Sequence, residues 1–144
     1  MEQAEKKKVN VPAVAGAVFG VIVIIGIQQF FFKAPSYDKA MMQAASEINK
    51  SCPMMVDKET RLDNAVALPD NVFQYNYTLV NMAKSDLDLV QLEEYMRPNL
   101  INTVKTNPDM KVNREHRTTF GYYYKDKNGE FLIKILVTPD LYEE

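Results

Sequence analysis

The feature that most constrains this chain is an uncharged, apolar run near its N-terminus. Residues 11–32 read VPAVAGAVFGVIVIIGIQQFFF and follow the three lysines 6–8. As a helix rising about 1.5 Å per residue, this run reaches roughly 33 Å, which is enough to cross the hydrocarbon core of a bilayer. The sequence therefore predicts a basic tail at 1–10, a transmembrane helix at 11–32 and a separate domain at 34–144.

Flanking charges set the predicted orientation of this helix. Lysines are concentrated before it, so the positive-inside rule places the N-terminus in the cytoplasm and the domain outside. A cleaved signal peptide is the alternative, but its apolar region is usually about 7–15 residues and ends at small residues. Here Phe32 stands at the −3 position of the candidate cleavage site, so the sequence favours a retained anchor.

Small residues recur along one face of the predicted membrane helix. Gly16 and Gly20 form a GxxxG motif, and Ala13 lies one turn earlier on the same face. Small residues allow two helices to approach closely, so these three positions are candidates for helix pairing and a homo-oligomer. The alternative is that they pair with nothing, because glycine is common in membrane helices.

Composition limits what the domain at 34–144 can be. It carries 13 Lys and Arg against 17 Asp and Glu, whereas a nucleic-acid-binding domain normally presents a basic face. Its one cysteine, Cys52, excludes an internal disulfide. Cys52 and the one histidine, His116, belong to no catalytic motif, and the chain has no metal-ligand spacing or phosphate loop. We therefore predict no catalytic residue, no metal and no cofactor.

Hydrophobic periodicity predicts two helix–hairpin units in this domain. Helical spacing of apolar residues predicts helices over 37–50 and from Ser85 to about Thr106, and Pro98 should kink or split the second. Alternating patterns predict four strands, over 60–68, 72–81, 112–125 and 130–138. The expected fold is α+β, in which two helices cover one face of a four-stranded, mainly antiparallel sheet in the order αββ-αββ.

A short sequence match accompanies this repeated order. Val56 to Arg61 resembles Val112 to Arg117 at a constant offset, which favours an internal duplication with repeats over 36–82 and 85–139. A curled sheet that wraps a helix, as in cystatin-like or nuclear-transport-factor-like folds, is an alternative built from similar elements.

Charged residues at matching positions of the two units form the main candidate site. We interpret them as a charge network that joins the units or as a surface that binds a partner; solvated ion pairs, each contributing about 0–1 kcal/mol, are the alternative. The residues are Asp57, Glu59, Arg61, Asp63, Arg114, Glu115 and Arg117. Tyr123 is predicted to be an exposed aromatic contact. A methionine cluster around the first helix either fills the core or forms an adaptable contact surface (Met41, Met42, Met54 and Met55).

One stretch of the chain resembles a pattern found in small uncharacterised bacterial envelope proteins that are anchored to the membrane. The pattern runs Asn49-Lys50-x-x-Pro53-x-x-Val56-Asp57-x-x-Thr60-Arg61-Leu62-Asp63 and continues with Tyr75-x-Tyr77-Thr78-Leu79. The resemblance implies a bacterial source and a domain that faces outward, and it implies no activity, ligand or catalytic residue.

These observations predict an interaction or assembly module of the bacterial envelope. It would be a single-pass protein of the inner membrane, with its domain in the periplasm or outside the cell and other envelope proteins as partners. A small-ligand-binding domain outside the cytoplasm is the alternative, and a small enzyme is the third possibility.

Overall fold

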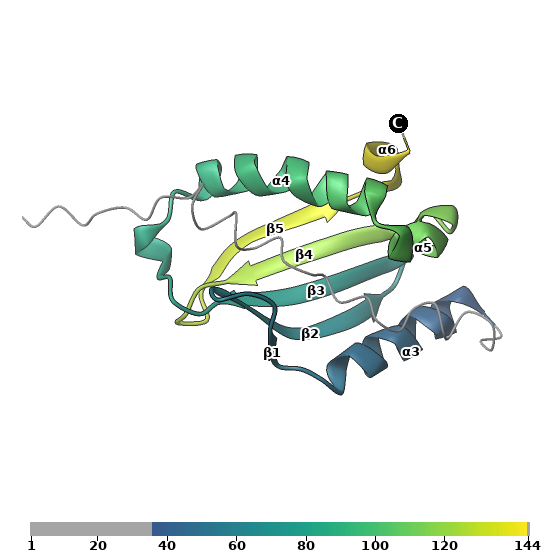
Figure 1. Cartoon of the computed structure of the whole chain (residues 1–144), viewed down its shortest axis with the longest axis horizontal. Helices are drawn as coiled ribbons and strands as arrows, with labels where there is room; N and C mark the ends of the chain where they lie inside the picture. The colour runs from purple at the N-terminus through teal and green to yellow at the C-terminus, as the bar shows by residue number, and fades with distance from the viewer. Residues whose placement is uncertain (1–35, 144) are drawn as a thin grey trace, which may run out of the picture.

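A five-stranded sheet forms the centre of the fold (Figure 1). The computed structural model describes residues 36–143, in which the strands follow one another in the spatial order β1-β2-β3-β4-β5. The strands are β1 (Met54–Met55), β2 (Thr60–Leu68), β3 (Val72–Leu79), β4 (Thr119–Lys125) and β5 (Phe131–Val137). The helices are α3 (Tyr37–Asn49), α4 (Leu89–Thr106), α5 (Lys111–Glu115) and α6 (Pro139–Tyr142), and the 3-10 turns are η1 (Lys84–Asp86) and η2 (Pro108–Met110).

The sheet is mixed, because its two hairpins meet through a parallel pair. β2 is antiparallel to β3 and β4 is antiparallel to β5, but β3 and β4 run parallel, with Phe73 beside Phe120. The predicted four-stranded, mainly antiparallel sheet is therefore wrong, and β1 adds a fifth strand. The physical reason is the crossover: α4 has 18 residues, spans about 27 Å and returns the chain to the end of the sheet where β3 began.

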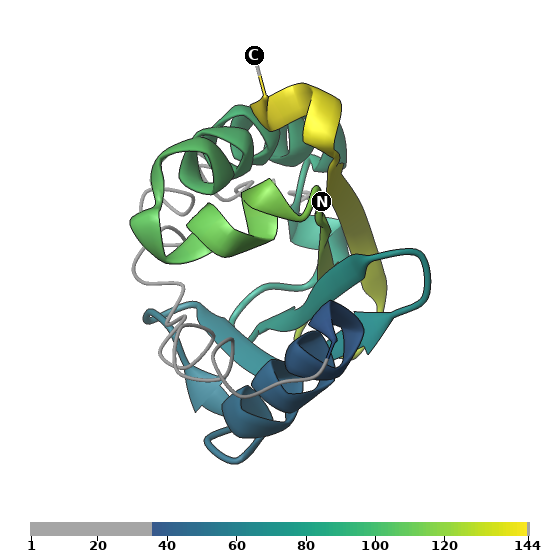
Figure 2. The same ribbon diagram turned by 90° about the vertical axis from the view of Figure 1, so that its right-hand side faces the viewer.

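Two helices cover the sheet at separate places. Figures 1 and 2 show α4 over the β5 side of the sheet and α3 beside β2, in agreement with their contacts. The core lies between these helices and one face of the strands. Its fully buried large side chains include Phe73, Tyr75, Leu92, Met96, Phe120, Tyr122 and Ile135.

Local signals place both long helices. The Ser36 hydroxyl accepts a hydrogen bond from the Lys39 amide at 3.3 Å, so the predicted first helix is confirmed with a capped N-terminus. The second helix begins at Leu89 rather than at Ser85, because the Asp88 carboxylate accepts from the Gln91 amide and acts as its cap. Pro98 lies inside α4 without splitting it.

The backbone does not repeat the sequence match between Val56–Arg61 and Val112–Arg117. The first segment is a turn that leads into β2, whereas the second forms most of α5 and the turn that follows. The predicted strand over 112–125 consequently begins only at Thr119. The duplicated αββ-αββ architecture is therefore corrected to two hairpins joined by four helical segments, which are η1, α4, η2 and α5.

The predicted transmembrane helix at 11–32 and its pairing face, Ala13, Gly16 and Gly20, lie outside the described residues. Among residues 36–143, no helix is both long and apolar enough to cross a membrane.

A side chain of α3 covers part of the outer edge of β2. The Asn49 amide nitrogen donates to the Ala65 carbonyl at 2.8 Å, and the Asn49 amide oxygen accepts from the Ala65 amide at 2.7 Å. The Asn49 amide thus pairs with β2 as a strand would, and it ties the end of α3 to the sheet. Edge strands need such cover, since their free backbone groups pair readily with other chains.

Asp126 connects the β4–β5 hairpin to the start of the crossover. Its buried carboxylate accepts hydrogen bonds from the backbone amides of Lys84, Asn128 and Glu130, at 2.8–2.9 Å. Burial alone would raise the pKa of this carboxyl, but these three donors lower the pKa below its ordinary value of 3.8. The charged carboxylate therefore stabilises the folded state.

We expect Asn49→Ala to lower the free energy of unfolding by about 1–3 kcal/mol, because the backbone amide and carbonyl of the buried Ala65 would lose their partner. Urea denaturation measures the change. Gln43→Ala, at an exposed position on the same helix, is the matched control and should leave stability unchanged. An equal effect of the two substitutions would contradict the role given to Asn49.

We also expect the stability contributed by Asp126 to depend on pH. A carboxyl whose pKa is lower in the folded state stabilises the fold at pH values above its pKa in the unfolded state. This stabilisation is lost as the pH falls through the pKa of the carboxyl in the folded state. Thermal unfolding of the native chain and of Asp126→Asn should therefore differ most at neutral pH, and the difference should shrink below pH 3.8. Glu94→Gln, on an exposed position of α4, should follow the native curve at every pH. A difference that stays constant with pH would refute this assignment.

Candidate functional site

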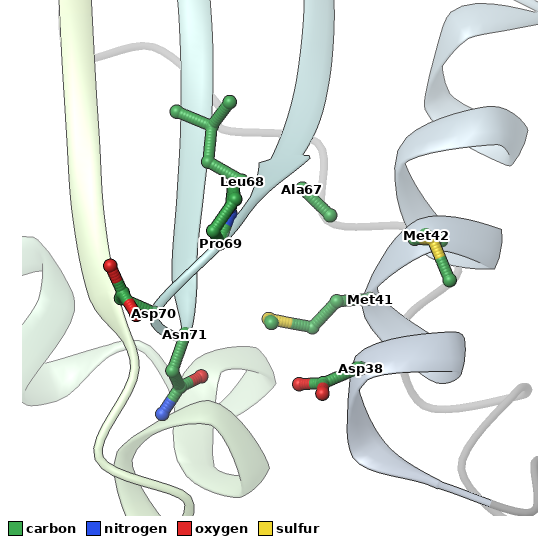
Figure 3. A pocket seen from close by; sticks show the side chains of 8 residues that line it. All are labelled: Asp38, Met41, Met42, Ala67, Leu68, Pro69, Asp70 and Asn71. Carbon is green, nitrogen blue, oxygen red and sulfur yellow. The ribbon is translucent and has the colours of Figure 1, made fainter.

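A pocket of about 510 Å³ opens between α3 and the far end of the β2–β3 hairpin (Figure 3). It falls within the size range of sites that bind small molecules or peptide side chains. The lining residues come from α3, β2 and the following turn: Asp38, Met41, Met42, Ala67, Leu68, Pro69, Asp70 and Asn71. We call this the α3–β2 pocket.

Hydrogen bonds at both ends of α3 fix the wall of this pocket. At its C-terminal end, Asn49 holds the helix to β2. At its N-terminal end, the Tyr37 hydroxyl shares a hydrogen bond with the Thr118 hydroxyl and accepts another from the Asn113 amide at 2.9 Å. The helix is thus anchored at two points, and the pocket lies between them.

The opposite wall is a tight turn held by its own contacts. The turn joins Leu68 to Val72 through three residues, and two of them, Asp70 and Asn71, have left-handed backbone conformations with φ of 64° and 60°, which Asp and Asn tolerate. The Asn71 side-chain amide donates to the His116 carbonyl at 2.6 Å, and this bond links the turn to the end of α5. Both walls are therefore pre-formed.

The lining combines sulfur-containing apolar side chains with carboxylates. In Figure 3, Met41 reaches from α3 toward the strands, and the Asp38 carboxylate lies on the same side of the helix. Met42 is 57% exposed, whereas Met41 is buried. Methionine adapts its shape to a partner, and the carboxylates of Asp38 and Asp70 favour a cation at the rim. The sequence showed these methionines as a cluster but could not show that two of them, Met41 and Met42, line a pocket.

The described residues that line the α3–β2 pocket form no catalytic arrangement. The lining has carboxylates but no nucleophile paired with a base. Within residues 36–143, no group of three or more His, Cys, Asp or Glu residues is placed to hold a metal ion. The pocket can therefore bind through shape, apolar contact and negative charge.

The first half of the predicted charge site forms a row on the sheet. Arg61 and Asp63 make an ion pair at 2.6 Å. The same carboxylate accepts from the Thr78 hydroxyl at 2.5 Å, and Lys125 lies 4.0 Å from it. These residues belong to β2, β3 and β4, so the network joins three strands of the sheet.

The other predicted charges act locally. Asp57 accepts from the backbone amides of Glu59 and Thr60 and stabilises their turn, and the Glu59 carboxylate accepts from Asn81 at 2.9 Å. The first half of the predicted charge site comprises Asp57, Glu59, Arg61 and Asp63. No ion pair or hydrogen bond between described residues joins this first half to Arg114, Glu115 or Arg117. A partner-binding role for either half stays a prediction.

The second half of the predicted charge site stabilises helix ends. Arg114 donates to the carbonyls of Val104 and Asn107, both at 2.7 Å, and so satisfies acceptors at the C-terminal end of α4. Arg117 pairs with Glu143, and Glu115 lies 3.8 Å from Lys111 within α5.

Tyrosines divide between the two faces of the sheet. Tyr123 is half-buried and packs against Phe131, with ring centroids 5.0 Å apart. Tyr75 and Tyr122 lie on the core face, with centroids 5.6 Å apart and exposed fractions of 1% and 0%. Their hydroxyls are buried and have no hydrogen-bond partner among residues 36–143, and burial raises the pKa of both. Tyr123 is thus the partly accessible member of this group.

Cys52 and His116 have separate surroundings. Partial burial, and then the charge of Asp63, raise the pKa of the Cys52 thiol, which disfavours the reactive thiolate. The His116 ring stacks on Tyr37, with centroids 3.9 Å apart and planes 6° from parallel.

Comparison with known sequences gives a family but no activity. A protein-family model described as a domain of unknown function (DUF8479) matches residues 35–133. No curated protein matches the sequence.

Solved structures share the fold at low sequence identity. A candidate secreted protein of Pseudomonas aeruginosa has a TM-score of 0.61 at 10% identity, and the match covers 75% of this chain and 98% of that one. The type II secretion system pilotin AspS of Vibrio cholerae has a TM-score of 0.53 at 14% identity, with 70% and 87% covered. The type II pilotin EpsS of Vibrio vulnificus has a TM-score of 0.56 at 10% identity, with 70% and 86% covered.

These neighbours contradict the predicted location. They are described as a secreted protein and as pilotins of a secretion system, whereas the sequence predicted a single-pass protein of the bacterial inner membrane. We do not carry that location forward.

The unpartnered tyrosine hydroxyls lead to a stability prediction. Tyr75→Phe and Tyr122→Phe should each leave the free energy of unfolding unchanged or raise it by about 1 kcal/mol, because each removes a buried polar group that has no partner. Tyr142→Phe is the matched control: its hydroxyl donates to the Thr118 carbonyl at 2.7 Å, so its loss should cost about 1 kcal/mol. Chemical denaturation of the three variants measures these changes. A loss of unfolding free energy for Tyr75→Phe as large as that for Tyr142→Phe would show that the Tyr75 hydroxyl has a partner.

Proposed function

The chain belongs to the DUF8479 family, and from its fold and its α3–β2 pocket we propose that it is a non-catalytic interaction module of the cell envelope. In this role it would bind a segment of another envelope protein and act within a larger assembly. The pocket is the observation that carries the proposal, because it is pre-formed and combines adaptable apolar side chains with an acidic rim.

The fold supports this class of function. Two of the structural neighbours are pilotins of type II secretion systems, and the third is described as a candidate secreted protein. Because their sequence identity to this chain is 10–14%, the likeness concerns the fold, and the binding role comes from the pocket itself.

The chemistry of the described residues also favours binding over catalysis. A catalytic site would need a nucleophile, an acid or a base placed in a cleft with a shifted pKa. In residues 36–143 the groups with raised pKa values are tyrosines and the Cys52 thiol, and none of them lines the α3–β2 pocket.

Site-specific photocrosslinking tests the proposal. A benzophenone side chain would replace Met42 in the full-length protein, expressed in its native cells, and the products would be identified by mass spectrometry. We expect one envelope protein to crosslink at this position. Val90, an apolar residue of α4 that is 69% exposed, provides the matched control outside the pocket and should not give that product. Identical products at the two positions, or none at Met42, would contradict the proposal.

Charge reversal provides a second readout in the same cells. Asp38→Lys should reduce the crosslink at Met42 about tenfold, because it replaces an attractive rim charge by a repulsive one. Glu94→Lys reverses an exposed charge on α4 and should leave the yield unchanged. Thermal unfolding of each variant verifies that the fold is retained.

A further inference from the structure

The outer edge of β2 is covered at two places. β1 pairs with Arg61 and Leu62 at the start of the strand. Further along, Asn49 bonds both the amide and the carbonyl of Ala65, which shows that the backbone groups of Ala65 point outward, away from β3.

Strand geometry extends this observation to Ala67. In an antiparallel pair the hydrogen-bonding direction of the backbone alternates, so residues two apart point their N–H and C=O groups to the same side. Since Ala65 points outward, Val66 points toward its partner Gln74, and Ala67 points outward again. Among the described residues, no hydrogen bond reaches the backbone of Ala67 across this edge.

This free backbone position lies inside the α3–β2 pocket. Ala67 is one of the lining residues, and Met41 reaches toward the strands from α3 (Figure 3), where Met42 also lines the pocket. Pro69, which has no N–H, ends the strand just beyond. One donor and one acceptor thus stand unpaired beside an apolar wall.

We propose that an extended segment of a partner protein pairs with β2 at Ala67 and adds a short strand to the sheet. This inference rests on the proposed function and names the binding mode of the same pocket. Strand addition uses backbone hydrogen bonds for affinity and side-chain pockets for specificity.

The lining defines the chemistry of that segment. An apolar side chain would pack against Met41 and Met42, and a neighbouring lysine or arginine would reach Asp38 or Asp70 at the rim. The partner strand would lie in line with β1 and the Asn49 amide, which already occupy this edge.

Removal of the outward amide of Ala67 tests the pairing. Ala67→Pro deletes this N–H and keeps the bonds between β2 and β3, and proline is tolerated on an edge strand when its missing N–H faces away from the sheet. In the cells with the crosslinker at Met42, we expect Ala67→Pro to lower the yield about tenfold, as the loss of one interface hydrogen bond implies. Ala67→Ser keeps the amide and should retain the native yield.

Hydrogen exchange gives a second measurement on the purified crosslinked complex. The amide of Ala67 should exchange at least tenfold more slowly than in the free protein. This readout uses the native residue at 67, so it does not depend on whether the proline variant folds.

Three outcomes would overturn strand addition. Equal yields for Ala67→Pro and Ala67→Ser, with unchanged exchange at Ala67, would indicate a partner that binds only through side chains, and the proposed function would still stand. A crosslink to a second copy of this chain would replace the partner by self-association. The absence of any specific crosslink at Met42 would refute the proposed function together with this inference.

Discussion

The parallel pairing of β3 with β4 is the constraint on which the rest of this fold depends. A parallel neighbouring strand requires a connection that returns the chain to the end of the sheet where the first strand began, and α4 provides this connection. Because α4 buries its apolar stripe against the strands, its position decides which face becomes the core. α3 covers the β2 side of that core, and the outer edge of β2 pairs with β1 at its start and with the Asn49 side chain of α3 at Ala65.

The same pairing of β3 with β4 fills the centre of the domain with packed side chains that stabilise the fold. It brings Tyr75 beside Tyr122 and Tyr77 beside Tyr124, with ring centroids 5.6 and 5.1 Å apart. Each stacked pair contributes about 0.5–1.5 kcal/mol beyond its burial, which partly offsets the cost of the unpartnered hydroxyls. Because these rings are fully covered, we expect recognition by this domain at its periphery, where a pocket separates α3 from the outer edge of β2.

Local chemistry in the sequence predicted much of this fold. Ser36 marked the first helix, the turn at 69–71 and the Asn128-Gly129 pair marked both hairpins, and alternation marked β3. Strand order could not be predicted, because the direction of β4 depends on how α4 packs, and its residues do not encode this locally. The short helix α5 was also missed, since its five residues are too few to show a helical period. The α3–β2 pocket depends on the contact of Asn49 with Ala65, a long-range hydrogen bond that no periodicity reveals.

In the proposed binding mode, the rim charges would make the open edge selective. A free strand edge invites pairing with any extended chain, including a second copy of the same protein. Two copies that met edge to edge at Ala67 would each bring the acidic side chains of Asp38 and Asp70 to the contact and no basic residue of the pocket lining to balance them, and like charges brought together are destabilising. A partner with a basic side chain meets the opposite sign. In the proposed binding mode, the same acidic rim would therefore also oppose self-association, which an interaction module needs if its edge is to stay free for another protein.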